Sequence, residues 1–144
     1  MEPVRIRIKS SATEGGQQPQ VTEQRYKGKL TEKAGKHYAI YDEDAQSGLE
    51  GTKTTLKWDA ERVIILRNGS VDHRQEFCKG LMDNSVYSTP YLKIPLTTET
   101  KYVYTSFRDG VWRLELEYTL HHGGSPYGDM KLLIEIEEDT ELGH

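Results

Sequence analysis

The sequence is poor in cysteine, with Cys78 the only one among its 144 residues. A single thiol excludes an intramolecular disulfide and a zinc site built from several cysteines. Long apolar runs are also missing, since the longest, Val63 to Leu66, has four residues and cannot cross a bilayer. The segment at residues 1–10 lacks the apolar stretch of a secretory signal. These absences predict a cytoplasmic protein without a membrane partner.

Basic charge is scarce as well. Lysine and arginine together number 19 against 23 aspartates and glutamates, which leaves a net charge of −4. A domain that binds phosphate backbones normally carries a basic excess, so this balance argues against nucleic-acid binding. Arg5, Arg7 and Lys9 alternate with apolar residues, a spacing typical of a solvated sheet face. We interpret the acidic stretch 135–141 as a solubilising tail.

Motifs of catalysis and cofactor binding are missing too. The chain has no G-x-S-x-G turn, and its glycine pairs at 15–16 and 123–124 lack the lysine of a phosphate-binding loop. The adjacent His121 and His122 point to opposite faces of a strand and cannot easily hold one metal. Cys78 is interpreted as an inert thiol, and the acidic run 42–44 as a solvated face. The sequence therefore predicts no catalytic residue, metal or cofactor, and favours a non-enzymatic protein.

What the sequence does contain is alternation of apolar and polar residues with a period of two. It is clearest in segments 4–9, 52–58 and 112–120. Because successive strand residues point to opposite faces, each segment has one apolar and one solvated face. No segment has a helical stripe over three turns, and 81–86 could form one helical turn at most. The expected strands are 4–12, 20–33, 37–43, 52–58, 62–67, 70–79, 86–92, 96–107, 111–121 and 130–138.

These segments predict an all-β chain of eight to ten antiparallel strands joined by short connections. Neither repeats nor a linker divide it, so residues 1–144 are expected to form one domain with a core at about 3–138. A meander of this length rarely stays a flat open sheet. Closure into a barrel, or folding into two packed sheets, removes the exposed edges. We favour the up-and-down β-barrel.

Asp109-Gly110 is a strong signal for a two-residue hairpin, because such a turn needs positive φ at both central positions. That loop length determines which residues of the two strands face each other. Tyr102 and Tyr104 then lie on the outer face, beside Glu117 and Glu115. The expected facing pairs are Phe107–Trp112, Thr105–Leu114, Val103–Leu116 and Lys101–Tyr118.

Asn68-Gly69 signals a second hairpin, for which two registers stay open. A two-residue loop pairs Leu66 with Val71, whereas a three-residue loop brings Arg67, Ile65 and His73 to one face. In both registers His73 and Gln75 share the face of Val71 and Phe77. The inward face therefore carries a polar pair on an otherwise apolar stripe.

Inward polar groups need a partner, because an unpaired polar group is costly to bury. A barrel of about eight strands is wide enough either to be filled by its own side chains or to hold one small ligand. We therefore take His73 and Gln75 as candidate ligand-binding residues, with Arg67, Tyr87 and Thr89 as their candidate partners. An internal hydrogen-bond network in a packed core is the alternative. Pro90 cannot donate to a ladder and marks an edge, a bulge or a bend.

Short motifs follow one another in order along the chain: Tyr41-Asp42-Glu43, Thr52 to Lys57, Arg67-Asn68-Gly69, Phe77 with Gly80, Tyr87-x-Thr89-Pro90-Tyr91, Thr100 and Tyr118. This set resembles the bacterial YwiB-like family. The resemblance covers roughly residues 3 to 138 and implies a cytoplasmic protein with a calycin-like, lipocalin-like β-barrel and no established activity. One position departs from the family pattern, since Leu92 stands where a glycine is expected.

Two functional hypotheses result. The first is a small barrel that binds a small molecule in or at the mouth of its lumen, without catalysis. The second is an interaction or structural module with a filled core that acts through its outer surface, including Tyr102 and Tyr104. The two differ in what occupies the lumen. The sequence leaves the ligand and the oligomeric state open.

Overall fold

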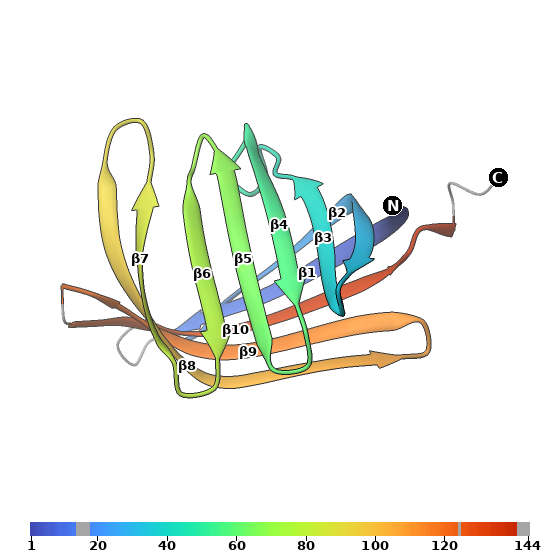
Figure 1. Cartoon of the computed structure of the whole chain (residues 1–144). Coiled ribbons are helices and arrows are strands. Elements are labelled where there is room, and N and C mark those ends of the chain that lie inside the picture. Colours follow the sequence, from blue (N-terminus) through green and yellow to red (C-terminus); the bar gives the residue numbers. More distant parts are fainter. Residues whose placement is uncertain (14–17, 124, 141–144) are drawn as a thin grey trace.

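The computed structural model describes residues 1–13, 18–123 and 125–140, and these form ten strands (Figure 1). The expected turn at Gly15-Gly16 lies outside the described residues, as do residues 141–144 of the acidic stretch and C-terminus. No helix in the described part of the chain is long and apolar enough to span a bilayer. The strands are β1 (Glu2–Thr13), β2 (Gln20–Lys33), β3 (Lys36–Asp42), β4 (Thr52–Trp58), β5 (Arg62–Gly69), β6 (His73–Cys78), β7 (Met82–Ser88), β8 (Lys93–Arg108), β9 (Val111–His122) and β10 (Ser125–Glu138).

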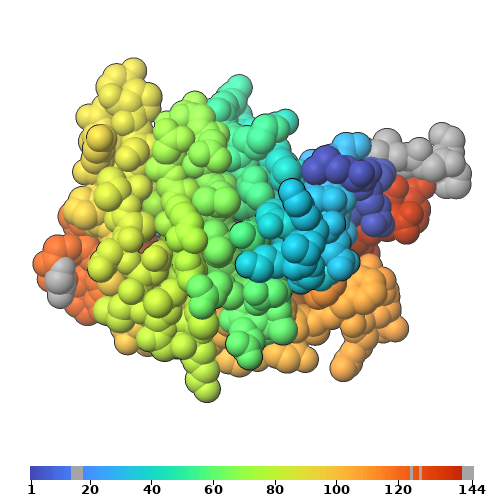
Figure 2. Space-filling view, viewed as in Figure 1, coloured from blue at the N-terminus to red at the C-terminus, as the bar shows by residue number. Residues whose placement is uncertain are grey.

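All ten strands belong to one antiparallel sheet in the order β6-β5-β4-β3-β2-β1-β10-β9-β8-β7. Sequence neighbours pair in ladders everywhere except at β6 and β7, and β1 pairs with β10, so the prediction of an up-and-down barrel is confirmed. In Figure 1 the strands β4–β6 cross in front of β8–β10 at a steep angle. The two outermost strands of this order, β6 and β7, are consecutive in the chain and lie side by side, as the green and yellow surfaces of Figure 2 show.

The segment around Pro90 departs from the predicted strand 86–92. The strand is β7, which ends at Ser88, and residues 82–86 form strand rather than a helical turn. Thr89 opens a tight turn, since its amide donates to the carbonyl of Leu92 at 2.9 Å and its hydroxyl accepts from the amides of Tyr91 and Leu92. Pro90 lies in this turn, where no ladder donor is needed. Of the readings left open for Pro90, the bend is confirmed.

The Asp109-Gly110 hairpin is confirmed, with φ of 55° at Asp109 and 78° at Gly110. The pairs nearest the turn match the prediction, and Tyr102 and Tyr104 face Glu117 and Glu115. The predicted Lys101–Tyr118 pair is wrong, because a bulge between Thr100 and Tyr102 inserts an extra residue. As a result Thr100, not Lys101, faces Tyr118 and points into the barrel.

The Asn68-Gly69 dipeptide does not form the predicted hairpin loop. Both residues continue β5 and pair with Lys53 and Thr52, so the chain turns later, at 70–72. Gly69 has a φ of 131°, and a Cβ there would collide with the carbonyl of Gly51, so the close pairing of β4 and β5 requires glycine. The observed register brings Arg67, Ile65 and His73 to one face, as the second predicted register does.

The middle of the lumen is filled by apolar side chains from strands on all sides. Trp58, Phe77 and Leu114 are almost completely buried there, together with Ile6 and Ile134. Since these residues come from β1, β4, β6, β9 and β10, the barrel packs as one hydrophobic core. Along β3–β5 the inward residues run from His37 at one end of the lumen to Tyr41 and Arg67 at the other.

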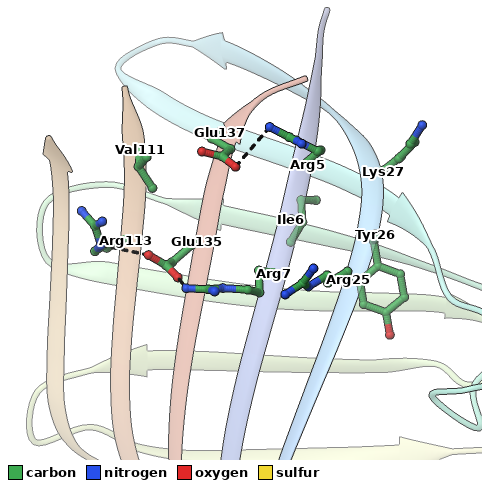
Figure 3. Close-up of a pocket in the computed structure, with 10 residues that line it drawn as sticks. All are labelled: Arg5, Ile6, Arg7, Arg25, Tyr26, Lys27, Val111, Arg113, Glu135 and Glu137. Carbon is green, nitrogen blue, oxygen red and sulfur yellow. Dashed lines mark hydrogen bonds and ion pairs between the residues drawn. The ribbon is translucent and has the colours of Figure 1, made fainter. Parts of the chain in front are cut away.

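The outer face of β9, β10, β1 and β2 carries a row of alternating charges (Figure 3). Glu135 accepts hydrogen bonds from Arg113, at 3.0 Å, and from Arg7, while Glu137 lies 3.4 Å from Arg5. Burial by itself would raise the pKa of Glu135, but Arg7 and Arg113 outweigh it and hold that pKa below its usual value. The interpretation of 135–141 as a solubilising tail is therefore wrong for Glu135, which is largely buried between two arginines, whereas Glu137 is exposed but belongs to β10, which continues to Glu138.

Candidate functional site

The barrel closes along a seam between β6 and β7. Asp72 and Ser88 exchange two backbone hydrogen bonds of 2.9 Å, and this is the one backbone bridge that the described residues form across the seam. Below it, side chains connect the strands, since the amide of Glu76 donates to Asp83 Oδ2 at 3.0 Å. A cleft of about 360 Å³ opens along the seam. Its walls include Arg67, His73, Asp83 and Ser85, with Arg74 and Asn84 on the outer side.

His73 lies on the inner side of this cleft and is 7% exposed. Its Nε2 lies 2.9 Å from Ser85 Oγ, and its ring meets the edge of Tyr87 with 5.4 Å between centroids. Burial, and then the charge of Arg67, lower the pKa of His73 to about 4. The imidazole is therefore neutral at pH 7. Its other nitrogen, Nδ1, is buried without a hydrogen-bond partner in the described structure.

Arg67 faces His73 across β5 and β6 and is partly buried. Its Nε is buried and has no hydrogen-bond partner in the described structure, and no carboxylate of the described residues forms an ion pair with it. Its charge nevertheless acts on its surroundings, because it lowers the pKa of His73 and opposes the burial that raises the pKa values of Tyr41 and Tyr118. The guanidinium of Arg67 thus forms no ion pair within 4.0 Å among the described residues, an arrangement that is costly unless something neutralises it.

Gln75 is 6% exposed and lies one inward position below His73. Its Nε2 donates to Thr98 Oγ1 at 3.2 Å, which ties β6 to β8 across the seam. Thr100, two residues further along β8, is 1% exposed, and its hydroxyl has no hydrogen-bond partner in the described structure. Gln75 is therefore hydrogen-bonded within the barrel, as the alternative of an internal network describes. The neighbouring hydroxyl of Thr100 has no such partner in the described structure.

A buried carboxylate completes this polar end. Glu43 is 8% exposed and accepts a hydrogen bond of 2.5 Å from Thr54 Oγ1. Burial, and then Glu43, raise the pKa of Tyr26 to about 12 and also raise that of Tyr41, whose ring stacks on Tyr26 at 4.4 Å. The interpretation of 42–44 as a solvated run is wrong for Glu43. The signal was in the alternation, since Glu43 lies two residues after the inward Tyr41.

The five predicted site residues are only partly brought together. Arg67, His73 and Tyr87 meet at the inner side of the seam, and Gln75 lies beside them. Thr89 does not join them, because its hydroxyl is engaged in the turn with Tyr91 and Leu92. Ser85, which was not among the predicted partners, is the hydroxyl residue that contacts His73.

Comparisons with known proteins agree with this architecture. The uncharacterized β-barrel protein YwiB of Bacillus subtilis (strain 168) is 28% identical over 121 residues, which cover 84% of this chain and 83% of that protein. The crystal structure of the ywiB protein from Bacillus subtilis superimposes with a TM-score of 0.83 at 26% identity, and the match covers 96% of this chain and 93% of that chain. The model of the family described as domain of unknown function DUF1934 matches residues 6–134. The chain therefore belongs to the DUF1934 family, as its resemblance to YwiB-like proteins implied.

Proposed function

We propose that this barrel binds a small organic anion, such as a carboxylate, in the cleft at the β6–β7 seam, without catalysing its conversion. The observation that carries the proposal is Arg67, a partly buried guanidinium that has no carboxylate partner among the described residues. A charge in that position is stabilised by an opposite charge that arrives with a ligand. The cleft volume of about 360 Å³ lies in the range of small-molecule sites.

The unpaired atoms of the site suit a carboxylate. A guanidinium presents its N–H groups as a planar fork that matches two carboxylate oxygens, and such charge-assisted hydrogen bonds are among the strongest in proteins. His73 Nδ1 lies on the same face and has no partner in the described structure, so it supplies a further polar contact. The resemblance to calycin-like barrels, whose lumens often hold small molecules, supports the same proposal by analogy.

His73 is suited to binding rather than to proton transfer. A general base works best with a pKa near the operating pH, whereas burial and Arg67 place the pKa of His73 at about 4. At pH 7 the imidazole is neutral and holds a fixed orientation against Ser85 and Tyr87. We therefore assign it a role in positioning the anion.

The test begins with native mass spectrometry of protein purified without denaturation, to detect a co-purified anion. Isothermal titration then compares octanoate and succinate, each beside its uncharged amide. We expect at least one carboxylate to bind roughly tenfold more tightly than its amide, because the amide cannot form charge-assisted hydrogen bonds with Arg67. Equal affinities for acid and amide, or no binding of either acid together with a clean apo mass, would contradict the proposal.

Two arginines of the same cleft provide a matched pair of variants. Arg67→Gln removes the inward charge and is expected to weaken carboxylate binding about tenfold or more. Arg74→Gln removes an outward charge that is 53% exposed and pairs with Glu76 at 3.0 Å, so binding should be unchanged. If Arg74→Gln weakened binding as much as Arg67→Gln, a general surface potential rather than a built site would attract the anion.

The outer surface supports a second candidate function, association with a protein partner. Tyr102 and Tyr104 are 42% and 46% exposed, and their rings lie 6.5 Å apart on one face of β8. Tyr102, Val21 and Leu133 line a groove of about 300 Å³ on the outer face, and the ring of Tyr104 lies next to Tyr102. Sedimentation velocity of the wild type and of Tyr102→Ala tests self-association through this patch. An unchanged distribution in the variant would count against it.

A further inference from the structure

The end of the lumen that lies opposite Arg67 is built from aromatic rings. His37 is the second residue of β3 and Trp58 ends β4, while Phe107 and Trp112 face each other beside the Asp109-Gly110 turn. Ring centroids of Trp112 lie 4.4 Å from His37, 5.0 Å from Phe107 and 5.6 Å from Trp58. Three rings, from β3, β4 and β8, therefore pack around Trp112 of β9, although β3 and β4 are distant in sequence from β8 and β9.

These rings are not sealed by the rest of the barrel. Trp58 is 1% exposed and forms the floor of the cluster, whereas Phe107 is 60% exposed. A cleft of about 540 Å³ lies between them and the ends of β1 and β10, with Leu30, His37, Phe107 and Trp112 among its lining residues. An exposed phenylalanine beside a tryptophan-lined cleft is an apolar surface that water solvates poorly.

Carboxylates make up most of the charge around this cleft, although Met1, which carries the N-terminal ammonium, also lines it. Glu2, Glu32 and Glu138 line it, as does Glu137, which lies 3.4 Å from Arg5. The described side chains that line the cleft include neither lysine nor arginine. His37 Nδ1 lies 3.9 Å from Glu32 and is the one titratable base among the described lining side chains. Aromatic faces and carboxylates both attract positive charge, so their effects add at this site.

We propose that this cleft binds an organic cation, specifically a methylated ammonium group that lies against the cleft-facing surfaces of Phe107, Trp112 and His37 and is held by the surrounding carboxylates. A methylated ammonium is weakly hydrated and presents apolar methyl groups, so it gains from ring faces that a metal ion would not use. Tryptophan is the best of these faces. The site lies outside the seam and does not depend on the anion site proposed above.

The test compares choline with 3,3-dimethylbutan-1-ol, which has the same shape but carbon in place of the charged nitrogen. Both tryptophans lie in the cluster, so their fluorescence reports occupancy of the cleft in the full-length chain. We expect choline to quench or shift this emission with an affinity about tenfold or more above that of the neutral alcohol. Equal responses to the two probes would overturn the proposal, and so would no response to choline at concentrations up to about 50 mM, beyond which affinities are not specific.

Single substitutions test whether choline binds at this cleft. Phe107→Leu keeps an apolar side chain without a ring, and Glu32→Gln removes one rim charge from a side chain that is 65% exposed, so both should fold. Each is expected to weaken choline binding roughly threefold to tenfold. Tyr104→Leu is the matched control, because this exposed ring lies on the same hairpin but on the outer face. Choline binding that Tyr104→Leu weakens as much as Phe107→Leu would also overturn the proposal.

Discussion

The two ends of the lumen share strands β4 and β5 and differ in chemistry. Along β5 the inward face runs from Val63 to Arg67, and along β4 it runs from Trp58 to Thr54. The end at Trp58 holds packed aromatic rings, whereas the end at Arg67 holds a guanidinium, an imidazole and hydroxyl groups. Period-two alternation places all of these residues on the inside. The alternation does not distinguish a side chain that stabilises the barrel from one that binds a ligand.

The energetic consequences of the two ends differ as well. Rings at the aromatic end exclude water from the core, and Trp58 contributes favourable burial. At the polar end, Arg67 Nε and His73 Nδ1 are buried without partners in the described structure, which lowers stability. Such groups are retained where they serve binding, at some cost to folding. Stability should therefore respond strongly to mutations at the first end and weakly, or in a pH-dependent way, at the second.

The largest effect is expected for Trp58→Ala at the aromatic end. Removal of a side chain that is 1% exposed leaves a cavity and should lower the free energy of unfolding by about 3 to 5 kcal/mol. Urea denaturation followed by circular dichroism measures this loss. Phe107→Ala is the control in the same ring cluster, and since Phe107 is 60% exposed its loss should stay below about 1 kcal/mol. Equal losses in the two variants would show that the rings do not differ in their role.

The next effect concerns pH at the polar end. The folded pKa of His73 is about 4, below the ordinary value of 6.5, so between these values the unfolded chain binds more protons than the folded one. Stability should therefore fall as the pH is lowered from 6.5 to 4, by about 2 to 3 kcal/mol between pH 7 and 4.5.

Urea midpoints across this pH range measure the effect, with His73→Gln as the control. The variant cannot take up the proton, so its stability should fall less than that of the wild type over the same range. Parallel curves for the two proteins would contradict the assignment of the shifted group to His73.

A smaller loss of stability is expected on removal of the hydrogen bond between Thr54 and Glu43 at the polar end. Thr54→Val removes the donor to Glu43 and leaves a buried carboxylate without that hydrogen bond, which should cost about 2 kcal/mol. Thr97→Val is the matched control, since Thr97 donates to Asn84 Oδ1 at 2.7 Å on the exposed surface. Thermal unfolding of both variants gives the comparison, and a greater loss for Thr97→Val would argue against a structural role for the Thr54–Glu43 pair.

The smallest effect is expected for Arg67→Gln. Because Arg67 has no carboxylate partner among the described residues, its removal should change the free energy of unfolding by less than about 1 kcal/mol, with any gain coming from relief of the unpaired charge. The same denaturation experiment measures it in ligand-free protein. A loss above about 2 kcal/mol would mean that Arg67 supports the barrel, and the contrast between the two ends would then disappear.

Strand positions could be predicted because they depend on local patterns. Alternation in segments such as 52–58 and 112–120 corresponds to strands that the structure contains, and Asp109-Gly110 turns as its φ preferences require. The register near the turn follows from loop length alone. Further along the same hairpin, the bulge at Thr100 depends on contacts with other strands, so the Lys101–Tyr118 pair could not be ruled out in advance.

The candidate site was predictable to a similar degree. His73 and Gln75 point inward in every register that the alternation allows, and the structure buries both. The missed residues, Glu43 and Ser85, are of types that normally lie on the surface. Glu43 finds its partner Thr54 on the neighbouring strand, and Ser85 meets His73 across the β6–β7 seam. Thr89 does not join the predicted site for the opposite reason, because its hydroxyl forms its hydrogen bonds within its own turn.

The sequence by itself determined that the chain is an antiparallel meander and which side chains of each strand face inward, because both follow from nearest-neighbour geometry. Only the tertiary structure decided that the seam falls between β6 and β7, that Arg67 lacks a counter-ion in the described structure, and that four aromatic rings gather at the opposite end. Closure and side-chain pairing depend on contacts between residues far apart in the chain. Their free energies are sums over many strands, which no local pattern contains.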